Sequence, residues 1–138
     1  MPEPGFNTSL RVLMTPQDTN HQGTVFGGVI LSRVDQAAYL EARRHGQHRW
    51  VTVCMERIEF KAPIWTGDIV DFDTKTEATG RSSVTVKVEV FAERYATRDR
   101  VAVTEAMVKM VAVNAAGQSI DFRGAPTVGA SVAPERRG

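Results

Sequence analysis

The chain has 138 residues, 42% of them hydrophobic, and its 17 Lys and Arg residues nearly balance 16 Asp and Glu residues, leaving a formal net charge of +1. That length predicts one domain with a modest core, which oligomerisation would supplement. The near-neutral charge argues against binding to nucleic acid or a membrane surface through the overall charge of the protein. No apolar run approaches the roughly 20 residues that span a bilayer.

The chain contains a single cysteine, Cys54. One cysteine excludes an intramolecular disulfide framework and a cysteine-based zinc cluster, which fits a reducing compartment. The first 14 residues lack a basic segment followed by a continuous apolar one, so we expect no secretion signal. The sequence therefore predicts a cytoplasmic protein.

The first half of the chain predicts a short strand at residues 9–14, a polar loop at 18–24 and one long helix. The helix is expected from residue 27 to about residue 45, because this stretch lacks proline and Gly46 is placed to end it. The apolar residues share one arc of a helical wheel, which predicts an amphipathic helix of about five turns. They are Ile30, Leu31, Val34, Ala37, Ala38 and Ala42.

Strands are predicted throughout the second half. Their ranges are 50–60, 69–78, 83–93 and 101–113, with turns at 63–68, 79–82, 96–100 and 114–117. The second and third strands alternate apolar and polar residues. The first and fourth are rich in Val, Met and Thr and alternate less cleanly, which is typical of central strands covered on both faces.

Strands joined by short turns pair antiparallel, and a single helix covers one face of such a sheet. We therefore predict an α+β fold with one domain over residues 1–122. One helix leaves the far face and an edge of the sheet open, so a second copy is expected to bury them. Residues 123–138 are crowded with Gly, Pro, Ala and Arg and are predicted to form a flexible C-terminal tail.

Asp35 lies at the margin of the apolar arc, and no Lys or Arg stands three or four residues away from it. Such a carboxylate is either a boundary residue in water or a group held for a distant partner or for reaction. Glu41 lies in the same arc, but its place near the helix end predicts contact with solvent. The residues alone leave both interpretations of Asp35 open.

Gly27 and Gly28 begin the predicted helix, although glycine costs roughly 1 kcal/mol relative to alanine there. One explanation is close packing against a strand, which the residues alone favour. The other is that open amide N–H groups at a helix start polarise an approaching carbonyl oxygen.

The loop before the helix carries Asn20 and His21. Asn20 is suited equally to capping a turn and to binding a water, and His21 has no acid partner adjacent in sequence. The spacing of His45 and His48 permits a metal site. With no nearby carboxylate except Glu41, a solvated turn is favoured, so no metal is predicted.

Residues 18–35, DTNHQGTVFGGVILSRVD, resemble the signature of the hotdog-fold acyl-CoA thioesterases, in the branch that includes bacterial YciA and the brain-type acyl-CoA hydrolases. The resemblance continues through residues 51–53, 60–63, 67–68, 82–84 and 104–106, and covers about residues 10–123. It implies a hotdog fold, in which a long central helix is wrapped by an antiparallel sheet. In that family the sheet is continuous across a dimer and active sites lie at the interface. The sequence leaves dimer, tetramer and hexamer open.

The resemblance further implies hydrolysis of acyl-CoA thioesters to a carboxylic acid and CoA, without a cofactor. The Gly28 N–H, with the neighbouring helix-start amides, would bind the thioester carbonyl oxygen. Asp35, contributed across the interface, would act as general base on a water or as a nucleophile forming a mixed anhydride. Asn20 would orient the water or the carbonyl.

We also assign substrate binding to seven residues: His21, Phe26, Gly27, Lys61, Arg81, Ser82 and Ser83. Arg81 and the two serines resemble the family's nucleotide-facing region, and Lys61 is a second candidate for the CoA phosphates. A role as exposed turn residues of no consequence fits them equally well. An apolar acyl slot is expected from Phe26, Ile30 and Val34.

Two other functions stay open. One is a non-catalytic acyl-CoA binding module, which ranks below hydrolysis because Asp35 and Asn20 are both retained. The other is a hotdog hydratase or dehydratase. That chemistry usually relies on a His paired with a carboxylate, and no His lies on the predicted helix beside Asp35.

Overall fold

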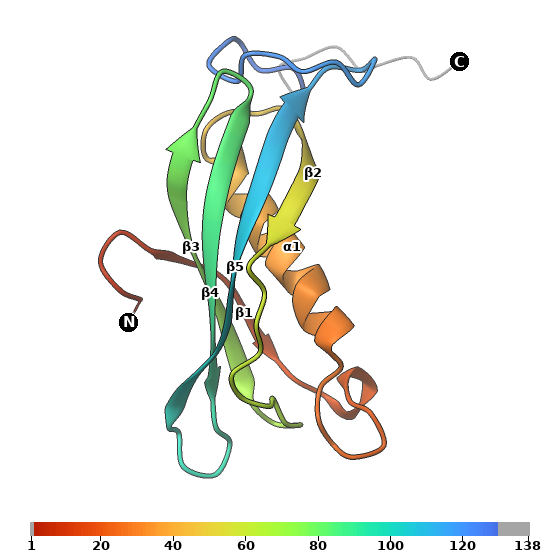
Figure 1. Ribbon diagram of the computed structural model, residues 1–138, viewed down its shortest axis with the longest axis vertical. Helices are drawn as coiled ribbons and strands as arrows, with labels where there is room; N and C mark the ends of the chain where they lie inside the picture. Colours follow the sequence, from red (N-terminus) through yellow and green to blue (C-terminus); the bar gives the residue numbers. More distant parts are fainter. Residues whose placement is uncertain (1, 130–138) are drawn as a thin grey trace.

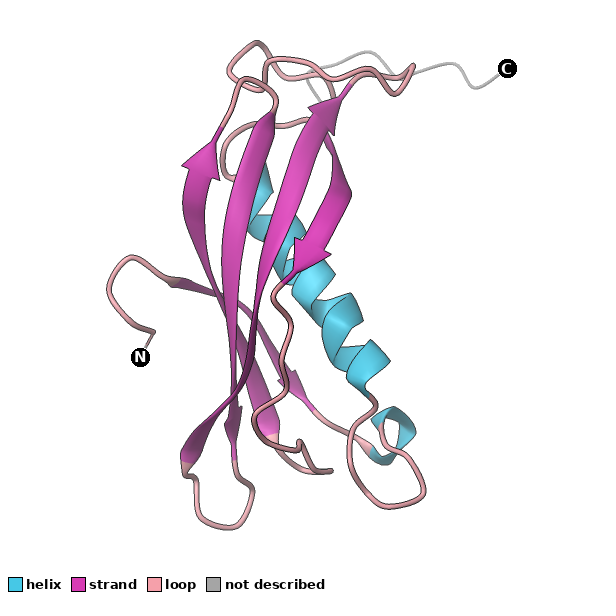
Figure 2. Cartoon of the chain, viewed as in Figure 1, coloured by secondary structure: helices cyan, strands magenta, loops and turns pink. Residues whose placement is uncertain are grey.

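A computed structural model describes residues 2–129, in which one long helix packs against a five-stranded sheet (Figure 1, Figure 2). The elements in chain order are β1 (Asn7–Leu13), the short 3-10 helix η1 (Pro16–Asp18), α1 (Gly27–Arg43), β2 (Arg49–Glu56), β3 (Ile69–Thr79), β4 (Ser83–Glu93) and β5 (Arg100–Val113).

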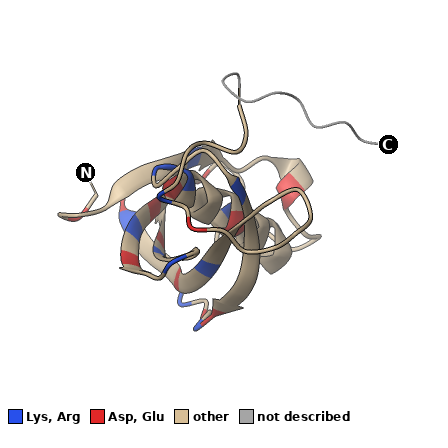
Figure 3. Ribbon diagram, turned by 90° about the horizontal axis from the view of Figure 1, so that it is seen from above, with Lys and Arg blue, Asp and Glu red and all other residues tan. Residues whose placement is uncertain are grey.

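The five strands lie in the order β1-β3-β4-β5-β2, and each neighbouring pair is antiparallel. Helix α1 contacts all five strands, and the sheet curves around it when the molecule is seen from above (Figure 3). The predicted arrangement, a long helix wrapped by an antiparallel sheet, is therefore present within one chain.

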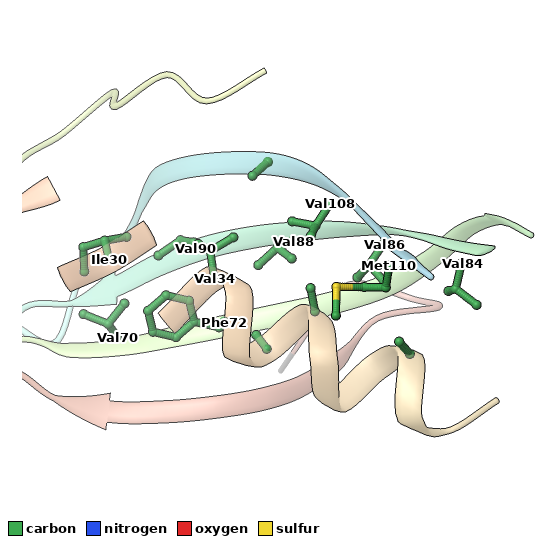
Figure 4. Packing of buried hydrophobic residues seen from close by; sticks show 14 of the residues in the cluster. Ile30, Val34, Val70, Phe72, Val84, Val86, Val88, Val90, Val108 and Met110 are labelled. Carbon is green, nitrogen blue, oxygen red and sulfur yellow. The ribbon is translucent and has the colours of Figure 1, made fainter. Parts of the chain in front are cut away.

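The core lies between α1 and the inner face of the sheet (Figure 4). In β4, every even-numbered residue from Val84 to Val90 is fully buried, as the alternation predicts. Helix α1 places Ile30, Val34 and three alanines against these valines. The small alanine side chains let the helix axis approach the sheet closely along its second half.

Strand β2 departs from the sequence prediction in two ways. It ends at Glu56 instead of residue 60, because Arg57 adopts a left-handed conformation with φ of 62° that stops the extended strand. The prediction of a central strand is wrong within one chain, because β2 is an edge of the sheet. Its residues Val51 and Val53 are exposed, so the apolar composition of β2 is not explained by burial in the monomer.

The prediction that Glu41 contacts solvent is also wrong, since this residue is only 6% exposed. Burial raises the pKa of Glu41. Hydrogen bonds from Thr76 at 2.8 Å and Thr74 at 2.9 Å, with the charge of Arg44 and a bond from Asn7, outweigh that effect and lower the pKa overall. The carboxylate thus joins the end of α1 to β3 and β1.

The outer face of the sheet carries an ion-pair network that covers Asp71 and Asp73 of β3. Both aspartates are buried. Arg100 of β5 donates to each of them at 2.9 Å, and Arg11 of β1 donates to Asp71 at 2.7 Å. The acidic positions of β3 therefore bridge three strands instead of facing water.

The segment after β5 returns to the end of α1. Phe122 is buried and packs against His45 and Trp50. His48 bonds to the Phe122 carbonyl at 2.7 Å and to the Thr127 hydroxyl at 2.9 Å. Residues 130–138 lie outside the described residues, so the flexible tail over residues 123–138 stays a prediction.

Candidate functional site

The start of α1 is open. Its first residue follows Phe26, which provides no side-chain cap, and the first amide N–H groups of any helix have no acceptor within the helix. Gly28 is exposed, and apart from its chain neighbours and the backbone of its own helix no heavy atom lies within 4 Å of where a Cβ would stand. Close packing therefore does not explain Gly28. The open-amide interpretation fits it, because an oxygen can reach this N–H unobstructed.

Asn20 organises the loop that leads into this helix start. Its side-chain amide donates to the Thr24 hydroxyl at 2.8 Å, and its side-chain oxygen accepts from the N–H groups of Gln22 and Thr24 at 2.9 and 3.3 Å. Its backbone N–H also donates to the Thr24 carbonyl. Asn20 thus caps a tight loop that fixes where α1 begins, while His21 lies exposed at its tip.

A pocket of about 450 Å³ opens beside the helix start. It lies between the first turns of α1, the end of the Asn20 loop and the segment that follows β2. The lining residues are Thr24, Val25, Gly27, Ile30, Phe60, Lys61, Ala62, Pro63 and Ile64. Most are apolar, so the pocket suits a chain of methylene groups with a cation, Lys61, at its wall.

The pocket includes three residues named from the sequence: Gly27, Ile30 and Lys61. Val34 is fully buried in the core and Phe26 is half exposed, and neither belongs to the lining. The apolar lining instead includes Phe60, Pro63 and Ile64. Sequence reasoning did not single them out as a lining because their position depends on how the chain folds after Arg57.

Asp35 is half-buried on α1 and accepts a hydrogen bond on Oδ1 from the Thr52 hydroxyl of β2. In the described part of the chain it makes no ion pair. Asp35 lies seven residues after Gly28, a rise of about 10 Å, and 100° per residue returns both to the same face of the helix. The Gly28 N–H and the Asp35 carboxylate of one chain are therefore too far apart to contact the same carbonyl group of a ligand.

Arg81, Ser82 and Ser83 lie at the turn between β3 and β4. This turn is near the C-terminal end of α1, so the structure does not bring them to the pocket of the same chain (Figure 1). Arg81 contacts the Ser119 hydroxyl at 3.4 Å, and the Ser82 carbonyl accepts from the Ala112 N–H at 2.8 Å. The guanidinium remains exposed.

Metal ligation finds no support in residues 2–129, where no group of three or more His, Cys, Asp or Glu side chains is arranged to hold an ion. His45 bonds to the Thr76 hydroxyl at 2.8 Å, and both ring nitrogens of His48 are engaged as described above. These two histidines fasten the end of α1 to its surroundings. The prediction of a solvated turn is wrong at His48, which is only 2% exposed.

Comparisons with known proteins agree with this geometry. The thioesterase superfamily profile matches residues 22–97. An acyl-CoA thioester hydrolase of Haemophilus influenzae, named as uncharacterized, is 39% identical over 113 residues, which are 80% of this chain and 73% of that protein. Acyl-CoA thioester hydrolase YciA of Escherichia coli K12 is 35% identical over 112 residues, covering 79% of this chain and 85% of YciA.

Solved structures give the same result. An aspartate-to-alanine mutant of HI0827, a hexameric broad-specificity acyl-coenzyme A thioesterase, superposes with a TM-score of 0.79 at 37% identity, over 83% of this chain and 84% of that one. The hexameric thioesterase y2039 of Yersinia pestis has a TM-score of 0.82 at 34% identity, over 88% of this chain and 98% of that one. A Staphylococcus aureus acyl-CoA hydrolase, solved with butyryl-coenzyme A, has a TM-score of 0.74 at 26% identity, over 96% of this chain and 74% of that one.

The match of the superfamily profile to more than half of the chain, the curated relatives and the hotdog structures all point the same way. They confirm the hotdog fold and the family that residues 18–35 indicated. The chain belongs to the thioesterase superfamily.

Proposed function

We propose that this protein hydrolyses acyl-CoA thioesters to the free carboxylic acid and CoA. The observation that carries the proposal is the uncapped start of α1, with an exposed Gly28, opening beside an apolar pocket of about 450 Å³. Relatives at 35–39% identity are named acyl-CoA thioester hydrolases. The pocket would take the chain of the substrate and the helix start its carbonyl oxygen.

In the proposed mechanism the Gly28 N–H donates to the thioester carbonyl oxygen, which gains negative charge as the tetrahedral intermediate forms. Asp35 either removes a proton from the attacking water or attacks the carbonyl carbon itself, giving a mixed anhydride that water then opens. In both routes the C–S bond breaks, the thiolate leaves, and the proton from water neutralises it.

The separation of Gly28 and Asp35 supports a site shared between two chains. A two-fold axis across paired helices brings Asp35 of one chain toward the Gly28 of its partner, and the reverse, so one interface creates two sites. The exposed apolar edge strand β2 supports pairing of two copies into one continuous sheet. The hexameric relatives favour three such dimers in the complete assembly.

The remaining site residues have binding roles in this proposal. Arg81, Ser82 and Ser83 of one chain and Lys61 would meet the phosphates of CoA, since exposed guanidinium and ammonium groups bind phosphate oxygens. His21 and Phe26 would contact the substrate at the mouth of the pocket. Asn20 holds the loop and would orient the water or the carbonyl from there.

No helix within residues 2–129 is long and apolar enough to cross a bilayer. A cytoplasmic location remains part of the proposal, and it rests on the single cysteine and on the substrate class.

Thiol release from acyl-CoA, followed with a thiol-reactive dye, tests the function directly. The wild-type protein is expected to release CoA, and Asp35→Ala to lose activity by at least about a hundredfold across short, medium, long and aromatic acyl groups. Tight calorimetric binding of intact acyl-CoA without hydrolysis over hours would instead identify a binding module. Wild-type turnover by Asp35→Ala would remove Asp35 from the mechanism.

A further inference from the structure

One side of the pocket beside the helix start has no regular secondary structure. Residues 57–64, which we call the pocket wall, form neither helix nor strand, yet they include five of the nine lining residues, from Phe60 to Ile64. Such a segment lacks the ladder of backbone hydrogen bonds that fixes a strand, so its position depends on individual contacts. The width of the pocket therefore depends on the groups that hold the pocket wall in place.

Hydrogen bonds to the sheet hold the pocket wall near both of its ends. Near its start, the Thr104 hydroxyl of β5 donates to the Glu59 carbonyl at 2.7 Å. Near its far end, Nη1 of Arg94, the residue that directly follows β4, donates to the Pro63 carbonyl at 2.9 Å. Pro63 has no backbone N–H, so its carbonyl is the backbone group through which it can be held.

The bond between Val25 and Ile64 has a different effect. The Val25 N–H donates to the Ile64 carbonyl at 2.8 Å, and both residues line the pocket. This bond joins two parts of the lining to each other. Arg94 supplies the connection to the sheet that this bond does not provide.

A buried ion pair fixes the Arg94 guanidinium itself. The side chain of Asp68 is only 3% exposed and that of Arg94 is 20% exposed. Nη1 of Arg94 donates to Oδ2 of Asp68 at 2.5 Å, and the Trp65 N–H donates to the same oxygen at 2.9 Å. Nη1 carries two N–H groups, so it can serve the Asp68 carboxylate and the Pro63 carbonyl together. An arginine held by a buried carboxylate presents a rigid donor to the pocket wall.

We propose that Arg94 is a positioning residue that sets the width of the acyl pocket, and with it the preference for acyl chain length. The inference rests on the proposed function, in which this pocket takes the acyl chain. Each methylene group that an apolar pocket buries strengthens binding by about fourfold, provided that the walls close around it. When the pocket wall is released at Pro63, a long chain loses more of these contacts than a short one. Arg94 does not line the pocket and acts through Pro63.

Arg94→Met tests the proposal, because methionine keeps an unbranched side chain and removes the donors. The measured quantity is the ratio of kcat/KM for octanoyl-CoA to kcat/KM for acetyl-CoA. Both substrates are assayed on one preparation, so the fraction of folded protein cancels from this ratio. We expect the ratio to fall by about tenfold, while kcat/KM for acetyl-CoA stays within about threefold of wild type. Arg94→Lys, whose ammonium group has three N–H donors, is expected to restore the ratio to within about twofold of wild type.

The matched control is Arg100→Met. Arg100 also donates to buried carboxylates, those of Asp71 and Asp73, and neither aspartate lines the pocket. Arg100→Met is expected to lower the melting temperature, as Arg94→Met does, and to leave the ratio unchanged. An unchanged ratio in a folded Arg94→Met protein would overturn the proposal, and so would an equal fall of the ratio in Arg100→Met.

The wild-type protein, assayed in parallel, separates this role from the proposed function. A wild-type protein that releases no CoA from either substrate defeats the proposed function and this role with it. An active wild-type protein with the same ratio as Arg94→Met defeats the positioning role alone. If Arg94→Met does not fold, Arg94→Gln is measured in its place with the same expected fall, because its shorter side chain does not reach both acceptors.

Discussion

Gly28 and Asp35 lie two turns apart on one face of α1, separated by a rise of about 10 Å. An oxyanion donor and a catalytic carboxylate must both lie about 3 Å from the same carbonyl group. Under the proposed mechanism, one chain therefore supplies two half-sites at the two ends of this face. We propose that a second, two-fold related chain completes both.

The Gly28 amide is the first group to test. Gly28→Pro removes its N–H, and proline is tolerated in the first turn of a helix, so the fold should persist. We expect kcat to fall by about a hundredfold to a thousandfold, the loss typical of one oxyanion donor. Gly28→Ala is the control: it keeps the N–H, and its Cβ meets open space. Equal losses in both variants, measured by thiol release, would exclude an amide role.

Arg81 is predicted to recognise the nucleotide part of CoA. Arg81→Ala is expected to raise KM for acyl-CoA by about tenfold, because a charge-assisted phosphate contact is lost. It should leave the hydrolysis of acyl-pantetheine unchanged, since that substrate lacks the nucleotide. Arg98→Ala, at the exposed turn between β4 and β5, is the matched control. An equal effect of Arg81→Ala on both substrates would show that Arg81 does not recognise the nucleotide.

The buried carboxylate of Glu41 is predicted to stabilise the fold near neutral pH. Its pKa is lowered, because hydrogen bonds from Thr76 and Thr74 and the charge of Arg44 outweigh the opposing effect of burial. A lowered pKa means that the stabilisation is present above the ordinary value of 4.5 and is lost as pH falls below it. Glu41→Gln should cost about 1–3 kcal/mol at pH 7 and flatten the acid limb of the stability curve.

Thermal unfolding from pH 3 to pH 8 measures this effect. Glu77→Gln, which removes an exposed carboxylate from β3, is the control and should leave the curve unchanged. A Glu41→Gln curve parallel to wild type down to pH 3 would contradict the assignment.

Glu89 on β4 is predicted to behave in the opposite way. Its pKa is raised, first by burial and then by the charges of Glu3, Glu105 and Asp73, against an opposing effect from Lys87. A carboxylate with a raised pKa disfavours folding once it ionises, so the cost appears as pH rises above 4.5. Glu89→Gln should raise the melting temperature at pH 7 by about 1–3 °C, with no gain at pH 3.5. A lower melting temperature at pH 7 would contradict it.

Local patterns in the sequence were sufficient to predict the limits of an element when its own alternation of apolar and polar residues determines which side chains are buried. The limits of β4 at residues 83 and 93 agree with the structure because alternate valines must face one core. The end of β2 could not be predicted, because it depends on the left-handed conformation of Arg57. The burial of Glu41 could not be predicted either, since its hydroxyl partners come from β3, more than 30 residues away.

The candidate site likewise contains some residues that the sequence predicts and others that only the tertiary structure reveals. Gly28 and Asp35 were identified from the helix and its resemblance to the family, while the hydrogen bond from Thr52 to Asp35 required the position of β2 beside α1. The apolar lining by Phe60 and Pro63 required the path of the chain after β2. Residues that act through tertiary contacts carry no local signal of that role in a single sequence.

Complementation between two inactive chains tests the shared site most directly. Asp35→Ala and Gly28→Pro chains are co-expressed with different affinity tags, and the mixed assembly is purified through both tags. A mixed dimer contains one site with an intact Asp35 and an intact Gly28, and one site that lacks both. We predict that each mixed dimer regains about half of the wild-type kcat, and that a hexamer with randomly assorted chains regains about a quarter, while each variant alone stays inactive. A mixed assembly as inactive as its two parents would contradict the shared site.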